Sequence, residues 1–301
     1  MLSAGTGTTT SNRTGPSGSR YLGAADMKLQ RIQLRPVAAA AVLAFASTGA
    51  LAEWPTDESW VGLEFFYPTI NSTGRLDSNS GNRGVEVNFE QDLDLTDRKG
   101  TPYLTLGTRL GERWRIQFEY YTLNRDGRKT LDRDINWGDT TYPIGANIET
   151  KFDSTIYRLT GGYSFIRTTE AELGFGFGFH TTDFKTQLSG QGTGVAAGFG
   201  FQREEHNTFV PLPTIGLYGT YVFNPQFAFR GRVDWLSLNV DQYDGSLVNW
   251  LGAFDWRFAK NWVTGVGYRY VNYKVSVTKS DFNGSIDYRF KGPTIYVWAN
   301  F

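Results

Sequence analysis

Residues 172–180 read ELGFGFGFH, so that every second residue is large and apolar while most of the residues between them are glycines. Successive side chains of a β-strand point to opposite faces, whereas the apolar face of a helix repeats every 3.6 residues. The stretch therefore predicts a β-strand with one strongly apolar face. Its other face is almost without side chains, which allows other groups to approach the backbone closely.

The same period-two alternation fills the chain from residue 53 to residue 301, and short connectors alternate with long ones. This rhythm is typical of a membrane barrel with short periplasmic turns and long extracellular loops. The sequence predicts an all-β fold, a closed antiparallel transmembrane β-barrel of ten strands, with eight strands as the alternative. The predicted strands are residues 60–69, 103–110, 114–120, 156–165, 172–180, 214–223, 227–235, 248–258, 262–270 and 285–301.

Composition narrows the function classes. The 301 residues are 16% aromatic, contain 35 glycines and balance 30 basic against 30 acidic residues. No basic excess exists to attract nucleic acid, so we expect no nucleic-acid partner. The absence of cysteine excludes disulfides and thiolate-bound metals.

The N-terminal segment is predicted to lie outside the fold. Residues 1–26 are rich in Gly, Ser and Thr, and we interpret them as a disordered extension that reflects a start site placed too early. From Met27, a basic stretch, an apolar stretch at 36–47 and Ala50-Leu51-Ala52 follow in the order of a secretory signal peptide. We expect residues 27–52 to be cleaved after Ala52, leaving residues 53–301 as an outer-membrane β-barrel.

Alternation alone does not say which face of the strands is inside. A soluble, lipocalin-like binding barrel would turn its apolar face inward, whereas a membrane barrel turns it toward lipid. Aromatic residues near the strand ends favour the membrane arrangement, because aromatic girdles lie at the lipid interfaces. The glycines would then leave room in the interior for long Arg and Glu side chains. The predicted girdle residues are Tyr67, Trp114, Tyr120, Tyr163, Phe165, Phe223, Trp256, Phe258, Trp262 and Trp298.

The polar faces of the strands carry charges that would share one lumen. We predict either a structural network, since buried charges must be paired, or a narrow passage that prefers anions, since bases outnumber acids. The predicted lumen-lining residues are Glu64, Arg109, Arg115, Glu119, Arg158, Arg230, Arg232, Asp234, Asp255, Arg257 and Arg269.

The C-terminal stretch GPTIYVWANF, residues 292–301, carries a family resemblance. Its alternating residues Ile295, Val297, Ala299 and Phe301 resemble the signal by which the assembly machinery recognises outer-membrane barrels. With VNFEQDLDL, TPYLTLGTRLGERWRIQFEYY and DYRFKGPTIY, the chain resembles the small Gram-negative barrels of the OmpA and OmpW type. The resemblance implies an outer-membrane location, with the bilayer, lipopolysaccharide and the barrel-assembly machinery as partners. OmpW-like barrels usually have eight strands.

Candidate catalytic groups are few. Outer-membrane lipid hydrolases place a Ser two residues after a His, but the two histidines, His180 and His206, are followed at that spacing by threonines. Ten-stranded surface proteases use acid pairs and a His at the rim, where only Asp241 and Asp244 are comparable.

Two further stretches are candidate ligand sites. The acidic stretch with Glu90, Asp92, Asp94 and Asp97 lacks the glycine and the distal glutamate of an EF-hand, and Gly-rich residues 189–201 lack the Lys of a phosphate-binding loop. We predict no catalytic residues, no metal and no cofactor. The predicted function is a non-enzymatic structural or surface role, or a narrow passage for small solutes; an outer-membrane lipid hydrolase or protease, and a soluble binding barrel, are the alternatives.

Overall fold

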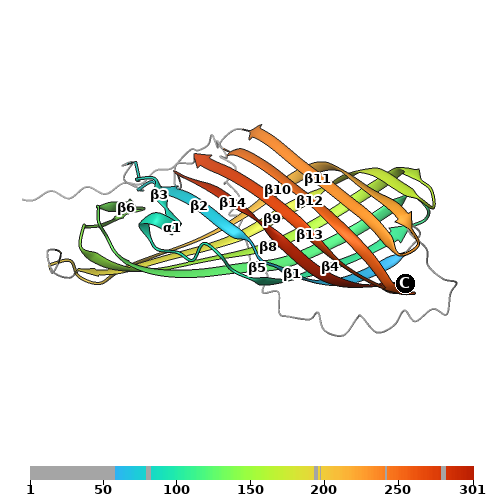
Figure 1. Cartoon of the computed structure of the whole chain (residues 1–301). Coiled ribbons are helices and arrows are strands. Elements are labelled where there is room, and N and C mark those ends of the chain that lie inside the picture. Colours follow the sequence, from blue (N-terminus) through green and yellow to red (C-terminus); the bar gives the residue numbers. More distant parts are fainter. Residues whose placement is uncertain (1–57, 79–82, 193–195, 197, 241–242, 279–282) are drawn as a thin grey trace, which may run out of the picture. The chain divides into compact units, whose positions relative to one another are not determined.

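Antiparallel strands dominate the computed structural model, which describes residues 58–78, 83–192, 196, 198–240, 243–278 and 283–301 (Figure 1). The predicted N-terminal extension and signal peptide lie outside the described residues. No helix among the described residues is long and apolar enough to cross a membrane. The elements are β1 (Ser59–Phe66), β2 (Thr69–Leu76), β3 (Val87–Asn88), α1 (Phe89–Asp92), β4 (Thr101–Leu110), β5 (Trp114–Thr130), β6 (Ile135–Trp137), β7 (Thr140–Tyr142), β8 (Ala146–Arg167), β9 (Ala171–Gly192), β10 (Gln202–Asn224), β11 (Phe227–Val240), β12 (Tyr243–Ala259), β13 (Trp262–Thr278) and β14 (Asn283–Asn300).

The sheet closes into a ring of ten strand positions. Strands β4, β5 and β8 to β14 follow one another in sequence order, and β1 pairs with both β4 and β14. β1 and β2 share one position, because β14 pairs with β1 along one half and with β2 along the other. Pro68 lies at the break between them and has no N–H to donate to a ladder. The prediction of a closed, antiparallel ten-stranded barrel is confirmed.

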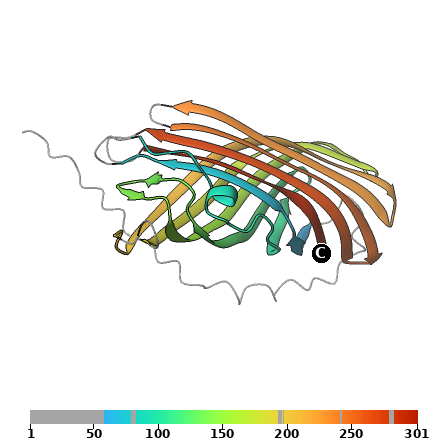
Figure 2. The same cartoon turned by 60° about the vertical axis from the view of Figure 1, so that its left-hand side comes forward.

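The two ends of the barrel differ. The end that we call the turn end holds the short connectors at 111–113, 168–170, 225–226 and 260–261, close to those expected, and the last residue of the chain. The opposite end, the loop end, holds β3, α1 and the small β6–β7 sheet (Figures 1 and 2). Much of the sequence expected as long loops instead extends the strands, so that β8 and β9 have 22 residues and β10 has 23.

The apolar faces of the strands point outward near the turn end. The outward side chain of Leu63 is 62% exposed and that of Phe177 is 50% exposed, whereas the side chain of Glu64 is buried in the interior. The C-terminal residues Ile295, Val297 and Phe301 also face outward. Trp298 corrects the predicted girdle, because it points into the barrel and is only 9% exposed.

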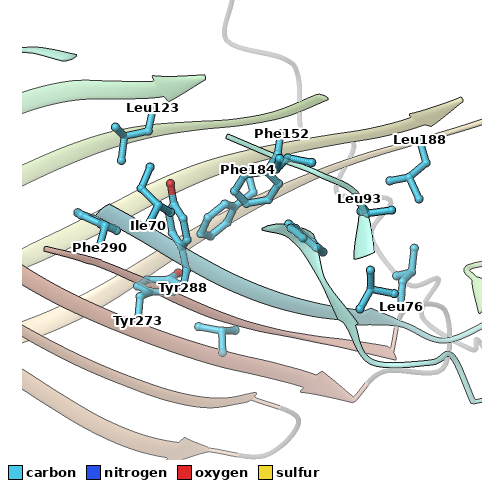
Figure 3. Packing of buried hydrophobic residues seen from close by; sticks show 14 of the residues in the cluster. Ile70, Leu76, Leu93, Leu123, Phe152, Phe184, Leu188, Tyr273, Tyr288 and Phe290 are labelled. Carbon is cyan, nitrogen blue, oxygen red and sulfur yellow. The ribbon is translucent and has the colours of Figure 1, made fainter. Parts of the chain in front are cut away.

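Toward the loop end the apolar face changes sides. Phe152 on β8 and Phe184 on β9 point inward, while the neighbouring Lys151 and Lys185 point outward. Inward apolar residues from most of the strands meet in one buried cluster, which Figure 3 shows from close by. Phe89 of α1 joins this cluster, with its ring 5.1 Å from that of Phe152. Part of the segment between β2 and β4 therefore packs inside the barrel.

Candidate functional site in the barrel interior

A charged cavity of about 80 Å³ occupies the interior near the turn end. Ten of the eleven predicted lumen residues line it, contributed by β1, β4, β5, β8 and β11 to β13. The exception is Arg257, which corrects the prediction. Its Nη1 donates to the backbone oxygen of Lys260 in the turn between β12 and β13, at 2.9 Å. Arg257 has the right strand parity but lies too close to the strand end to reach the cavity.

Arg158 is central to the charges of this cavity. Its guanidinium on β8 donates to carboxylate oxygens of Glu119 on β5 and Asp234 on β11, and all three side chains are buried. Arg232 adds a second cation to Asp234, with 2.9 Å between Nε and Oδ2. The four residues form a connected network that spans the interior, so that their carboxylates and guanidinium groups are paired despite burial.

Two more pairs extend the charged layer toward β14. Arg230 Nε lies 3.3 Å from Asp255 Oδ2, and the Arg230 guanidinium stacks on Trp298 at 3.8 Å from the ring centroid. Arg269 Nη2 lies 3.7 Å from Glu64 Oε2. The inward Trp298 thus covers an arginine with its indole face, an arrangement that favours a cation.

Glu172 is a lining residue that the sequence analysis missed. Arg109 binds it with two hydrogen bonds, Nη1 to Oε1 at 2.9 Å and Nη2 to Oε2 at 2.7 Å, and Ser164 Oγ also donates to Oε1. The signal was available, because Glu172 has the same parity as the inward glycines Gly174 and Gly176. Glu172 lies at the start of its strand, next to the connector at 168–170, so the sequence does not distinguish it from an acidic turn residue.

The inward glycines were expected to make room for long Arg and Glu side chains, and Gly162 and Gly176 do lie beside Arg115 and Arg232. The tightest approaches, however, are to aromatic rings. A Cβ built on Gly174 would lie 2.3 Å from Cζ of Tyr218, and one built on Gly107 would lie 2.1 Å from the Trp60 ring. Backbone and ring are in contact at both places. Within the glycine-rich stretch, Gly174 is thus the complement of Tyr218 on the neighbouring strand β10.

An aromatic layer closes the interior above the charged cavity. Tyr103 and Tyr121 stack with ring centroids 4.5 Å apart, and Phe66 and Phe290 each lie about 6 Å from the ring of Tyr121. All four side chains are at most 2% exposed. These rings come from the neighbouring strands β14, β1, β4 and β5, so that they cover one side of the interior, and Phe152 of β8 and Phe184 of β9 meet Tyr288 of β14 from the other side. Tyr288, Phe152 and Phe184 continue the layer toward the loop end (Figure 3).

The candidate catalytic residues are dispersed. His180 is buried in the interior beside Tyr273, at 6.2 Å between ring centroids. His206 lines a small apolar pocket of about 70 Å³ at the loop end, where its Nε2 lies 3.5 Å from Glu204 Oε2. Thr208 lines the same pocket. Asp241 lies outside the described residues, and Asp244 is part of β12.

In the acidic stretch, the carboxylates of Glu90 and Asp92 are paired with arginines. Glu90 Oε1 pairs with Arg125 Nη1 at 2.5 Å, and Asp92 Oδ2 pairs with Arg133 Nη2 at 2.7 Å. Burial acts to raise the pKa of Asp92, but the hydrogen bonds from Arg133 and from the backbone N–H of Asn88 hold it below its usual value. Among the described residues, no cluster of His, Asp and Glu has the arrangement of a metal site.

Comparison with solved structures shows what this fold is similar to. The outer membrane protease OmpT from Escherichia coli aligns with a TM-score of 0.52 at 12% identity, over 85% of this chain and 100% of that chain. The transport unit of the autotransporter AIDA-I from Escherichia coli gives 0.40 at 9% identity, over 82% of this chain and 92% of that one. The toluene transporter TodX from Pseudomonas putida gives 0.37 at 9% identity, over 81% and 90%. No protein-family model and no curated protein matches the sequence.

The likeness to OmpT concerns the fold. The chain has the architecture of an outer-membrane β-barrel, with ten strand positions and an outward apolar face. At 12% identity the likeness carries no activity across, so the function has to be argued from the residues of this chain.

Proposed function

We propose that the chain is an integral outer-membrane β-barrel protein with a sealed interior and a structural or surface role. The observation that carries this proposal is the filled lumen, in which paired charges near the turn end lie beneath a closed layer of buried aromatic rings. Side chains fill the interior of eight-stranded barrels, whereas open porins have sixteen or more strands, and the ten strand positions of this chain are closer to the filled class. The narrow-passage alternative loses support, because a solute would have to displace that layer.

An outer-membrane location is supported by the outward apolar faces. A transmembrane strand needs about 9–11 residues. On β9, outward apolar residues run from Leu173 to Phe179, and beyond them outward Asp183 and Lys185 mark the change to polar surroundings. We propose lipid acyl chains as the partner of the apolar zone, lipopolysaccharide as the partner of the polar zone above it, and the barrel-assembly machinery as the partner of the C-terminal residues. The relationship to OmpA/OmpW-type barrels belongs to this proposal, and the ten-strand ring differs from the eight strands usual in OmpW-like proteins.

Conductance in planar bilayers tests the sealed interior. We expect the refolded chain 53–301 to insert without producing single-channel steps at any applied voltage. Stable steps whose size changes in Arg230→Ala or Arg232→Ala, both cavity residues, would instead assign a passage. A Tyr121→Ala/Phe290→Ala variant, which removes two rings of the seal, tests whether the assay detects an opened lumen, and Phe175→Ala/Phe177→Ala on the outer face is its matched control.

A non-catalytic role is supported by the surroundings of the histidines. A nucleophile needs a base that a third group holds in place. His206 Nε2 lies 3.5 Å from Glu204 Oε2. The same carboxylate accepts a hydrogen bond from a hydroxyl group, since Thr140 Oγ1 donates to Glu204 Oε1 at 2.5 Å. The hydroxyl of Thr140 therefore binds the carboxylate of Glu204 and not the imidazole of His206, which a nucleophile would need as its base. Assays of lipid and peptide hydrolysis should detect no turnover; turnover that disappears in His206→Ala would overturn this part of the proposal.

A further inference from the structure

The charges that line the interior cavity do not balance. Six arginines and five carboxylates face it. Each carboxylate has at least one arginine partner. The pairs are Arg109–Glu172, Arg158–Glu119, Arg158–Asp234, Arg232–Asp234, Arg230–Asp255 and Arg269–Glu64. The remaining cation is Arg115, which forms no ion pair or hydrogen bond with any side chain that the structure describes.

Arg115 is held in place by an aromatic ring rather than by a direct ion pair. Its guanidinium carbon lies 3.4 Å from the ring centroid of Tyr218, so one face of the planar group is covered. Glu172 is the acid in its vicinity, but two hydrogen bonds from Arg109 and one from Ser164 already occupy that carboxylate. The N–H edge of the Arg115 guanidinium, which carries its five donors, is therefore left for another acceptor.

The ring beneath Arg115 is fixed by its own contacts. Tyr218 is 4% exposed, and its hydroxyl lies 3.0 Å from Ser164 Oγ. Gly174 and Gly162 leave the space that the ring fills, since a Cβ on either would lie within 2.8 Å of it. A guanidinium stacked on an immobile ring loses little further freedom when it binds an anion, which favours binding.

We propose that this cavity binds one small free oxyanion of the phosphate or sulfate type through the N–H edge of Arg115. A planar guanidinium matches two oxygens of a tetrahedral oxyanion. The cavity volume of about 80 Å³ accommodates such an ion with little water. Asn300 and Thr220, both near strand ends, line the cavity as well, so the cavity extends toward the turn end. The aromatic layer closes the other end, which makes the cavity a blind binding site rather than a passage.

Binding is tested with inorganic phosphate on the detergent-solubilised chain 53–301, titrated by calorimetry at constant ionic strength set with chloride. We expect saturable binding of one phosphate. Glycerol 3-phosphate, the smallest ester of the lipid type, should bind at least tenfold more weakly, because the ester blocks one of the four phosphate oxygens and adds a glycerol group beside the paired charges that line the cavity. The reverse order would assign a lipid head group instead and overturn the free-ion proposal, as would the absence of saturable phosphate binding.

Two variants test whether the anion binds at Arg115. Arg115→Met keeps the length and the ring contact but removes the charge, and should reduce the affinity for phosphate at least tenfold. Arg113→Met, an exposed arginine two residues away in the turn, is the matched control and should bind as the unchanged chain does. Equal affinity in all three chains would overturn the site. If Arg115→Met fails to fold, anomalous diffraction from crystals of the unchanged chain soaked in selenate decides: a peak beside Arg115 supports the site, and a peak elsewhere or no peak overturns it.

Discussion

Arg158 and Asp234 form an ion pair through the barrel interior, although their strands, β8 and β11, are separated by β9 and β10 in the ring. Arg158 also holds Glu119 on the adjacent strand β5. One guanidinium therefore ties three strands together from inside, and the covalent hairpins do not supply this link. The charged layer stabilises the closed barrel by contacts that cross it.

Removing Arg158 should destabilise the barrel strongly. Arg158→Met leaves Glu119 buried without its closest cation and weakens the pairing of Asp234, and loss of one partner of a buried pair costs about 3–5 kcal/mol. Urea unfolding in lipid vesicles, followed by tryptophan fluorescence, measures the loss. Arg128→Met is the control, because Arg128 pairs with Glu149 at an exposed site, 3.3 Å apart, where pairs contribute about 0–1 kcal/mol. Equal losses in both variants would show that the internal network contributes no more than a surface pair.

The aromatic layer makes a second prediction. Phe290→Ala deletes a ring that packs at 6.2 Å from both Phe66 and Tyr121, and the cavity left in a packed core should cost about 3–5 kcal/mol. Phe177→Ala removes the same group from the outer face, where lipid refills the space, and should cost clearly less. Unfolding in vesicles compares the two. A larger loss for Phe177→Ala would mean that the layer is loosely packed.

The barrel itself could be predicted because its signal is local. Strand parity places Phe177 outside and Arg158 inside from the sequence alone, and ten predicted runs correspond to ten strand positions. The interior charges followed from the same parity. Arg257 did not, because parity gives the direction of a side chain but not its depth along the barrel axis.

The strand extensions could not be predicted because the apolar face changes sides within one strand. On β9, Phe177 faces outward and Phe184 faces inward, and the residues between them, His180-Thr181-Thr182, resemble the end of a strand. In the proposed outer-membrane location, the change marks where lipid ends and water begins outside the barrel. For the same reason Tyr121, Phe152 and Phe184 of the aromatic layer were not predicted, since they lie beyond the ends of the predicted strands. Phe66, Tyr103 and Phe290 lie within predicted strands, on the face opposite to the apolar alternation.

Gly174 tests the complementarity between the glycine-rich strand and the interior. In Gly174→Ala the new Cβ would meet Tyr218 at 2.3 Å, so the ring must move and lose its contacts with Arg115 and Ser164. We expect a loss of about 1–3 kcal/mol, as for other overpacked cores. Gly231→Ala is the control, because the nearest atom to its Cβ would lie 3.8 Å away. A neutral Gly174→Ala would contradict the tight contact, and thermal unfolding of both variants distinguishes the outcomes.

The segment that enters the loop end should respond to acid through Asp92. Its carboxylate accepts hydrogen bonds from the N–H of Asn88 at 2.8 Å and from Arg133 Nη2 at 2.7 Å, and it follows Phe89, which anchors α1 in the buried cluster. Burial acts to raise the pKa of Asp92, but these hydrogen bonds and the positive charge of Arg133 lower it below the usual 3.8. A carboxyl group with a lowered pKa in the folded state stabilises that state at pH values above 3.8. Its contribution is lost as the pH falls from 3.8 through the lowered value.

Hydrogen exchange of residues 88–95 measures this effect. Protection should be constant near neutral pH and decrease below pH 3.8 once the intrinsic pH dependence of exchange is removed, while the β13–β14 ladder stays protected. Asp92→Asn should lower the protection at neutral pH and flatten its pH dependence, because the amide keeps a polar group but loses the charge that attracts Arg133. Asp94→Asn, an exposed carboxylate of the same loop, should behave as the unchanged chain does. If Asp94→Asn flattens the profile and Asp92→Asn does not, the acid response of this segment does not come from the pair of Asp92 with Arg133.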